Sequence, residues 1–239
     1  MIPISPTPDA EPGRDCALCP RIVDLRHACQ AEFPSFWNAP VPSFGDPQAW
    51  LAIVGLAPGK HGANRTGRSF TGDFAGDMLF ETLAKFGLTE GEYNRRADDG
   101  VTLKGAVILN AVKCLPPENK PTPEEIRTCR PLLGDALKSL PNVRTVIALG
   151  EIAHQSVLKI FGAKLPKHRF AHGAEHRMLD GRLVLDSYHC SRYNVNTGRL
   201  TAEMLEAVFE RATAARGAIH VINEGVATNS DVDESVERR

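Results

Sequence analysis

Four of the six cysteines in this 239-residue chain have the spacing of metal ligands. Cys16 and Cys19 form a CxxC pair, Cys114 ends an apolar run, and Cys129 lies on the helix predicted after it. Four thiolates can close a tetrahedral site for zinc or hold an iron–sulfur cluster. The spacing leaves both groups open, and it also permits two pairs of unrelated buried thiols. We predict a four-cysteine centre and do not expect the other two cysteines to be ligands.

The stretch GLAPGKHGANRTGRSFTGD, residues 55–73, follows an apolar run and holds five glycines. Glycine permits close approach of the backbone to another molecule, so we expect a loop that a ligand can touch. Asp73 ends this loop at the start of a predicted helix. The helix N-terminus would lower the pKa of this carboxyl and keep it ionised for chemistry. The alternative is that Asp73 only caps the helix, while Asp77, one turn later, is expected to be a solvated residue.

Two further polar side chains end apolar runs. Asn110 closes AVILN, where a buried amide needs a partner and could read the edge of a planar base. The alternative is an amide satisfied by a neighbouring loop. His189 opens HCSRYNVNTGRLT, a connection dense in hydroxyl, amide and cationic groups that could contact phosphate oxygens. The alternative for this connection is a solvated loop that caps the next helix.

Apolar strands alternate with helices along the chain, which predicts a parallel sheet covered on both faces. Functional sites in such folds lie at the carboxyl ends of the strands, where the loops just described begin. The predicted strands cover residues 49–56, 105–114, 142–150 and 182–189. The predicted helices cover residues 20–31, 72–88, 122–140, 151–162 and 201–215, and a proline-rich crossing covers 33–48.

Composition excludes several classes of protein. The formal net charge is −1 and the pI is about 6.7, so a uniformly basic nucleic-acid binder is not indicated. No apolar run reaches the roughly 20 residues that a membrane helix needs, and we expect a cytoplasmic protein. We predict a disordered arm at residues 1–15, a single domain at 16–216 and a polar, acidic tail at 217–239.

Together, the first loop, NAVKC at residues 110–114 and the loop from His189 resemble the uracil-DNA glycosylase superfamily, most closely its family 5, the type-B iron–sulfur enzymes. The resemblance covers about residues 16–210. It implies a three-layer α/β/α fold around a four-stranded parallel sheet, and a [4Fe-4S] cluster on the four cysteines. The implied activity is hydrolysis of the N-glycosidic bond of uracil or another deaminated base, such as hypoxanthine, in DNA, which leaves an abasic site.

The resemblance also assigns roles to residues. His189 would hydrogen-bond the departing base, and Arg192 and Tyr193 would wedge into the duplex after the base is flipped out. The implied base-binding residues are Gly55, Ala57, Phe70 and Asn110. The implied DNA-binding residues are His61, Asn64, Arg65, Ser191, Arg192, Tyr193 and Asn194.

One position departs from the family pattern. Most families of this fold carry a water-positioning carboxylate or amide directly after the first strand, where this chain has Leu56 and Ala57. We therefore expect Asp73 to take that catalytic role, acting on water or on the cation-like sugar. We expect the protein to act on damaged DNA as a monomer. One alternative is a DNA-damage-binding protein with an iron–sulfur cluster but little turnover. Another is a covalent link to DNA through His61, which is less favoured because no long basic insertion surrounds it.

Overall fold

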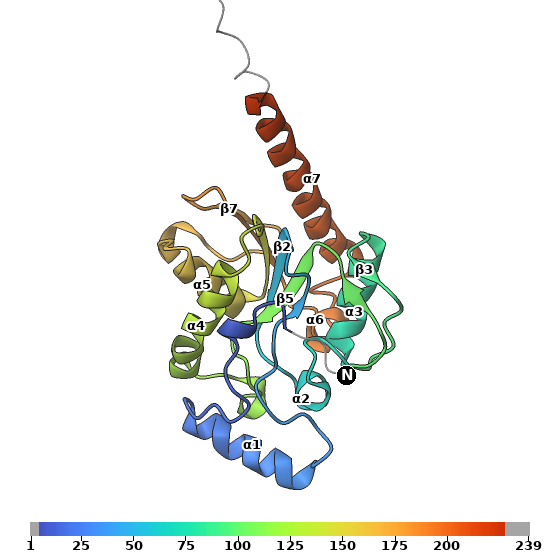
Figure 1. Ribbon diagram of the computed structural model, residues 1–239, viewed down its shortest axis with the longest axis vertical. Coiled ribbons are helices and arrows are strands. Elements are labelled where there is room, and N and C mark those ends of the chain that lie inside the picture. The colour runs from blue at the N-terminus through green and yellow to red at the C-terminus, as the bar shows by residue number, and fades with distance from the viewer. Residues whose placement is uncertain (1–4, 228–239) are drawn as a thin grey trace, which may run out of the picture.

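The computed structural model describes residues 5–227 and is built around one mixed sheet of six strands (Figure 1). The strand order is β1-β5-β2-β6-β8-β7, in which the four central strands are parallel. Gly55 pairs with Asn110 in the register of β2 and β5, so the two predicted site residues end adjacent strands. The strands are β1 (Phe44–Gly45), β2 (Leu51–Gly55), β5 (Ala106–Asn110), β6 (Thr145–Leu149), β7 (Glu175–Arg177) and β8 (Leu183–Ser187).

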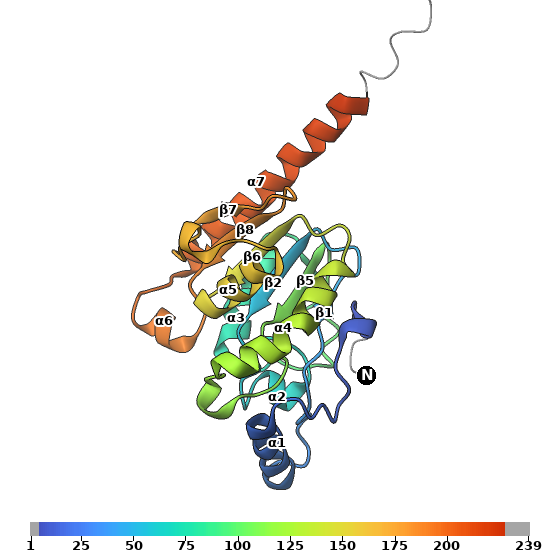
Figure 2. The same cartoon turned by 90° about the vertical axis from the view of Figure 1, so that its left-hand side faces the viewer.

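Every residue of the four central strands is buried, because each strand contributes alternate side chains to two cores. On one face, Ile53 and Ile108 pack with α3 and α7. On the other face, Val54 and Leu109 pack with α4 and α5. The two helical layers are visible on opposite sides of the sheet in Figure 1, and Figure 2 looks onto the layer of α4 and α5. The predicted three-layer arrangement is therefore confirmed.

Local sequence signals determine where the helices begin. Asp73 caps α3 by accepting a hydrogen bond from the backbone N–H of Gly76. Thr122 and Glu125 form a reciprocal capping box at the start of α4. The helices are α1 (Pro20–Glu32), α2 (Ala63–Thr66), α3 (Phe74–Lys85), α4 (Pro123–Lys138), α5 (Glu151–Ile160), α6 (Arg192–Asn196) and α7 (Ala202–Ala227), with 3-10 turns η1 (Pro8–Ala10), η2 (Pro117–Asn119) and η3 (Leu165–Lys167).

The sheet has two more strands than the four predicted. Strands β1 and β7 pair antiparallel with the outer parallel strands β5 and β8. They contain two and three residues, too few for a hydrophobic period to show in the sequence. A separate small hairpin, β3 (Thr89–Glu90) with β4 (Thr102–Leu103), follows α3 and carries the loop between them.

Both ends of the described chain differ from the predicted arm and tail. Residues 5–15 pack on the domain: Ala10 is buried, and Glu11 forms an ion pair of 2.9 Å with the buried Lys113. Helix α7 continues past Gly217 to Ala227, while residues 228–239 of the predicted tail lie outside the described residues. None of the helices between residues 5 and 227 is long and apolar enough to cross a membrane.

Candidate active site and cysteine centre

The carboxyl edge of the sheet brings together the side chains that the sequence singled out there. Gly55 ends β2 and Asn110 ends β5, while His189 follows β8 by two residues. The end of the first loop returns to the same place, because a Cβ on Gly55 would lie 2.7 Å from the Phe70 ring and 2.8 Å from Oδ1 of Asn110. Gly55 is therefore required by the packing of Phe70 and Asn110 over the strand end.

Phe70 and Asn110 form the buried floor of this site, with 7% and 3% of their surfaces exposed. The ring of Phe70 lies nearly parallel to that of His189, with centroids 5.8 Å apart. Phe70 has a left-handed backbone, with φ of 52°, which costs a non-glycine residue energy and needs support from its surroundings. The NH2 group of Asn110 donates to Ser69 Oγ at 3.0 Å, so the loop that carries Phe70 also orients the amide.

Asp73 combines the two roles that the sequence left open. One carboxylate oxygen, Oδ1, accepts from Gly76 N at 3.0 Å and caps α3. The other, Oδ2, lies against the glycines of the first loop, 3.4 Å from a Cβ placed on Gly59. Burial raises the pKa of Asp73, and the neighbouring Asp77 adds to this, although the N–H of Gly76 opposes it. This direction is opposite to the lowering expected from the helix N-terminus, because desolvation outweighs the helix terminus here.

A hydrogen bond to the backbone of His189 holds this residue in place, and its imidazole ring faces Phe70 in the site. Its carbonyl oxygen accepts from the side-chain NH2 of Asn194 at 2.8 Å. Burial lowers the pKa of His189 to about 4, so the ring is neutral near pH 7. A neutral imidazole still donates one N–H, which can serve a developing negative charge.

Of the residues after His189, two make hydrogen bonds within the protein and two are exposed to solvent. Ser191 caps α6, and Asn194 fixes the His189 carbonyl, so both are occupied within the protein. Tyr193 is 71% exposed, and Arg192 is exposed with its guanidinium 5.6 Å from the Phe74 ring centre. The exposed positions of Arg192 and Tyr193 are compatible with the predicted contact with a duplex.

The predicted DNA-binding residues of the first loop also differ in their exposure to solvent. His61 and Arg65 are exposed, and His61 meets the rings of Phe33 and Phe36 edge-on. Asn64 is 4% exposed and donates to Asn38 Oδ1 at 3.0 Å, which differs from the predicted DNA contact because its amide is committed to the fold.

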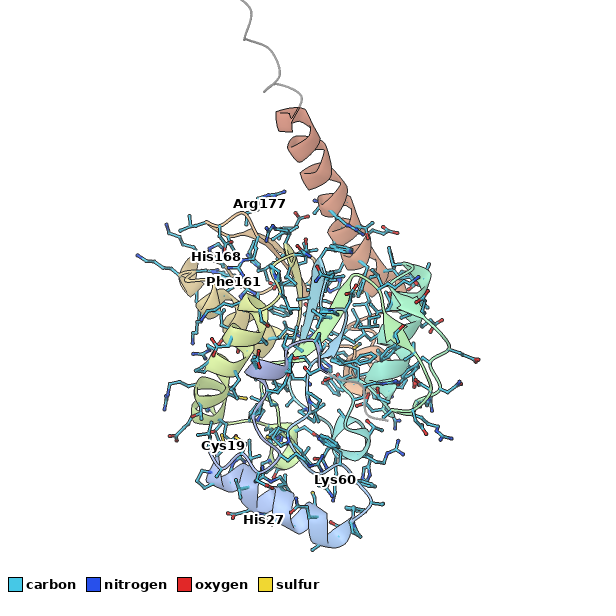
Figure 3. All side chains as sticks on the ribbon, in the orientation of Figure 1. Cys19, His27, Lys60, Phe161, His168 and Arg177 are labelled. Atoms are coloured by element: carbon cyan, nitrogen blue, oxygen red, sulfur yellow. The ribbon has the colours of Figure 1, made fainter. Side chains whose placement is uncertain are left out.

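Two other residues of this loop lie near α1. Ala57 packs beside the apolar side chains around the cysteines. Lys60 forms an ion pair of 3.2 Å with Glu32 at the end of α1. Figure 3 labels Lys60 beside this helix. Neither contact was evident from the sequence.

A buried polar cluster behind His189 was not evident from the sequence either. Asp186, on β8, is fully buried and accepts from His154 Nδ1 at 2.7 Å and from His176 Nε2 at 2.8 Å. His154 also contacts the carbonyl of His168 at 3.1 Å, so the cluster ties α5 and the segment before β7 to the end of β8. The only sequence signal was an Asp inside an apolar strand, LVLDS.

The four predicted cysteines lie around one small, mostly apolar cavity, and all are reduced. Cys16 and Cys19 precede α1, Cys114 lies four residues beyond the end of β5, and Cys129 is on α4. Burial raises the pKa of Cys114 to about 12, and the thiols of Cys129 and Cys16 add to the effect. Cys129 Sγ accepts from the backbone N–H of Lys113 at 3.3 Å.

The spacing of the four sulfurs distinguishes between the groups they could hold. In residues 5–227, the one set of three or more His, Cys, Asp or Glu ligand atoms within 4.8 Å of one another is that of His154, His176 and Asp186. Four sulfurs at about 2.3 Å from a single zinc ion would lie roughly 3.8 Å apart and would meet that limit. No three of the cysteine sulfurs in the described part of the chain meet that limit, which is compatible with a group larger than a single ion. Cys29 and Cys190 are buried and do not line this cavity.

A mostly parallel sheet that gathers an aspartate, an aromatic ring, an amide and a histidine at its carboxyl edge is the arrangement of an α/β enzyme. The sequence model of the uracil DNA glycosylase superfamily matches residues 42–213. The chain therefore belongs to the uracil DNA glycosylase superfamily.

Individual relatives agree with this assignment. The chain is 45% identical over 207 residues to the type-5 uracil-DNA glycosylase of Thermus thermophilus, covering 84% of this chain and 94% of that protein. It is 46% identical over 209 residues to the type-5 enzyme of Pyrobaculum aerophilum, covering 86% and 91%. The type-5 enzyme of Mycobacterium tuberculosis is 40% identical over 211 residues, covering 84% of this chain and 78% of that protein.

Proposed function

We propose that this protein is a type-5 uracil-DNA glycosylase that flips a deaminated base out of DNA and hydrolyses its N-glycosidic bond. The observation that carries the proposal is the meeting of Asp73, Phe70, Asn110 and His189 at one edge of the sheet. A base inside a duplex is inaccessible, so the enzyme must extrude it into such a pocket. Uracil and hypoxanthine are the substrates we propose, and the product is an abasic site.

The buried side chains account for base recognition. The flat ring of Phe70 offers a stacking surface, and the amide of Asn110 offers a donor and an acceptor to the edge of a base. Because Ser69 already orients this amide, its geometry is fixed before the base arrives. This preorganisation supports the proposed pocket.

The remaining two groups account for bond cleavage. As the bond to the sugar breaks, negative charge grows on the base, and the neutral ring of His189 donates a hydrogen bond to it. The sugar becomes cation-like and needs a water molecule and an anion nearby. Asp73 serves both needs: its Oδ2 is free of the helix cap and can orient the water, and its raised pKa makes it a stronger base than an exposed aspartate.

We also propose that Cys16, Cys19, Cys114 and Cys129 hold a [4Fe-4S] cluster. The spacing of the sulfurs, the apolar cavity and the N–H···S hydrogen bond to Cys129 support a cluster rather than a zinc ion. When bound, the cluster would join the start of α1 to β5 and α4. We assign it a structural role, and we propose that the enzyme acts as a monomer in the cytoplasm.

Incubation with a uracil-containing duplex, followed by alkali, tests the activity. Strand cleavage at uracil, but not in a matched duplex with thymine, is the expected result. The rival function is a damage-binding protein with little turnover, motivated by Leu56 and Ala57 where other families carry a water-positioning group. Tight binding without cleavage at uracil, hypoxanthine or xanthine would support that rival and contradict the proposal.

A further inference from the structure

A groove beside Asp73 has no role in the chemistry described above. It runs between the segment after α1, helix α2 and the loop that joins β3 to β4. Its walls carry three arginines, Arg65, Arg95 and Arg96, with one carboxylate, Asp98, and the ring of Phe36. The lining is therefore net positive, in a protein whose overall charge is near zero.

The groove opens next to the candidate active site. The Nη2 atom of Arg65 lies against Gly72, directly before Asp73 in the chain. Arg95 forms an ion pair with Asp77, one turn into the helix that Asp73 caps. A strand that enters the groove would thus lie alongside the site in which its flipped base is bound.

The ion pairs of these arginines orient them without exhausting their donors. Arg95 uses Nε and Nη2 to bind Asp77 at 2.7 and 2.6 Å. Arg96 uses the same two atoms to bind Asp98 at 2.9 and 2.8 Å. A guanidinium has five N–H groups, so each arginine keeps three for a ligand. Such exposed pairs stabilise a protein little and compete weakly with a phosphate.

Buried contacts hold the loop that presents Arg95 and Arg96 against the domain. Arg68 donates to both oxygens of Asp99 at 2.7 and 2.8 Å, and both side chains are 1% exposed. Tyr93 donates to the carbonyl of Phe70 at 3.1 Å and accepts from Gly72 N at 3.2 Å. The same contacts join this loop to the loop that carries the base pocket.

The backbone of Arg95 adds a second sign of function. Its φ is 61°, a left-handed conformation that is uncommon for any residue with a side chain. Such strain persists where the surroundings hold it, and it concentrates at binding sites. Here it accompanies a guanidinium already fixed by Asp77, so little entropy would be lost when a ligand binds.

We propose that this groove binds the phosphodiester backbone of the DNA strand that carries the flipped base, with Arg95 and Arg96 each contacting one phosphate. Paired N–H groups of guanidinium match phosphate oxygens in geometry and charge. The proposal rests on the proposed glycosylase function, because that function supplies the DNA strand beside Asp73. It adds residues that lie outside the two loops by which the chain resembles its family.

The test compares the Arg95→Gln/Arg96→Gln variant with Lys104→Gln/Lys138→Gln. The control removes the same charge from two exposed lysines outside the groove, each also paired with an acid, Glu90 or Asp135. Affinity for a duplex is measured by fluorescence anisotropy at several salt concentrations. We expect the slope of log K against log salt to fall in size by about 1.8 in the arginine variant, at roughly 0.9 per phosphate, and to stay at the wild-type value in the control.

Three outcomes are decisive. If the wild-type protein cleaves uracil DNA but the slope of the arginine variant is unchanged, the proposal that the groove binds DNA is overturned. The proposed glycosylase function then still holds. Wild-type protein that does not bind DNA overturns both. Equal losses in the two variants also overturn the groove, since the effect would be one of net charge. If the double variant unfolds, Arg96→Gln alone, whose ion-pair partner is the exposed Asp98, is expected to lower the slope by about 0.9.

Discussion

The carboxylate of Asp73 packs directly against the backbone of Gly62. A Cβ atom on Gly62 would overlap Oδ2 of Asp73 and lie 2.8 Å from its Cγ. At this position, glycine in the first loop makes room for the protein's own carboxylate, where the sequence suggested room for DNA. The loop and Asp73 therefore form one unit, and a change in either should displace the other.

Gly62→Ala should displace the carboxylate, because the added Cβ atom would overlap Oδ2 of Asp73. The ψ of Gly62, −114°, lies outside the regions that alanine favours, so the rate is compared in protein shown to be folded by circular dichroism. A shift of about 1 Å in a catalytic group can cost roughly 100-fold in rate, so we expect about that loss in single-turnover uracil release. Gly217→Ala is the control, because no atom lies within 4 Å of the added methyl group. Wild-type rates for Gly62→Ala would show that Oδ2 does not need its present position.

The raised pKa of Asp73 predicts the pH dependence of uracil release. The active form is the carboxylate, so the rate should fall as pH decreases through the pKa, which burial places above the ordinary 3.8. His189 remains neutral over most of this range because its pKa is about 4. Single-turnover rates across acid pH should show a limb with a midpoint above 3.8. A rate independent of pH down to that value would contradict the assignment.

The buried pair of Arg68 and Asp99 should matter for stability. Its removal in Asp99→Asn leaves a buried guanidinium without its counter-ion, which costs about 3–5 kcal/mol in unfolding free energy. The neighbouring exposed pair of Arg96 and Asp98 offers the control, since Asp98→Asn should leave the free energy of unfolding almost unchanged. Urea unfolding of the two variants measures the difference, and equal midpoints would refute it.

The pair of Arg68 and Asp99 also predicts how stability changes as the pH falls. Although burial opposes it, hydrogen bonding to Arg68 lowers the pKa of Asp99 to about 2, from 3.8. The stabilisation is thus complete above about pH 4 and is lost as the pH falls toward 2. The difference in stability between wild type and Asp99→Asn should shrink over that window. A difference that stays constant would show that ionisation of Asp99 is not its source.

Cys114→Ala should abolish the cluster. We expect the brown colour and the iron content of the purified protein to vanish, because four thiolates are needed to hold the group. Cys29→Ala is the control, since Cys29 is also a reduced cysteine but does not line the cavity. Colourless native protein that contains zinc would defeat the iron–sulfur assignment.

The central sheet and most of the site could be predicted because their signals are local. The four parallel strands are continuous apolar runs, and Asn110 and His189 stand where those runs end. In contrast, β1 and β7 are too short to show a period. The packing of residues 5–15 depends on the contact of Glu11 with a lysine about 100 residues away, which no local pattern reveals.

The misjudged properties of the site arise from burial and distant contacts. The pKa of Asp73 depends on how deeply the folded loop covers it, so the helix terminus alone gave the wrong direction. In the sequence, Asn64 lies in a polar loop and was predicted to contact DNA, but in the structure its side-chain amide donates a hydrogen bond to Asn38. The polar cluster around Asp186 joins segments that are far apart in the sequence, and so does the buried ion pair of Arg68 and Asp99. Neither was therefore visible as a sequence motif.

Asp73→Asn tests the proposed catalytic role of this carboxylate more directly than any other variant. It keeps an oxygen for the helix cap but cannot accept a proton from water, so we expect single-turnover uracil release to fall by about 100- to 10,000-fold. Affinity for uracil-containing duplex should remain at the wild-type level, since the amide removes no DNA contact. Release at the wild-type rate by a folded Asp73→Asn protein would show that another group activates the water.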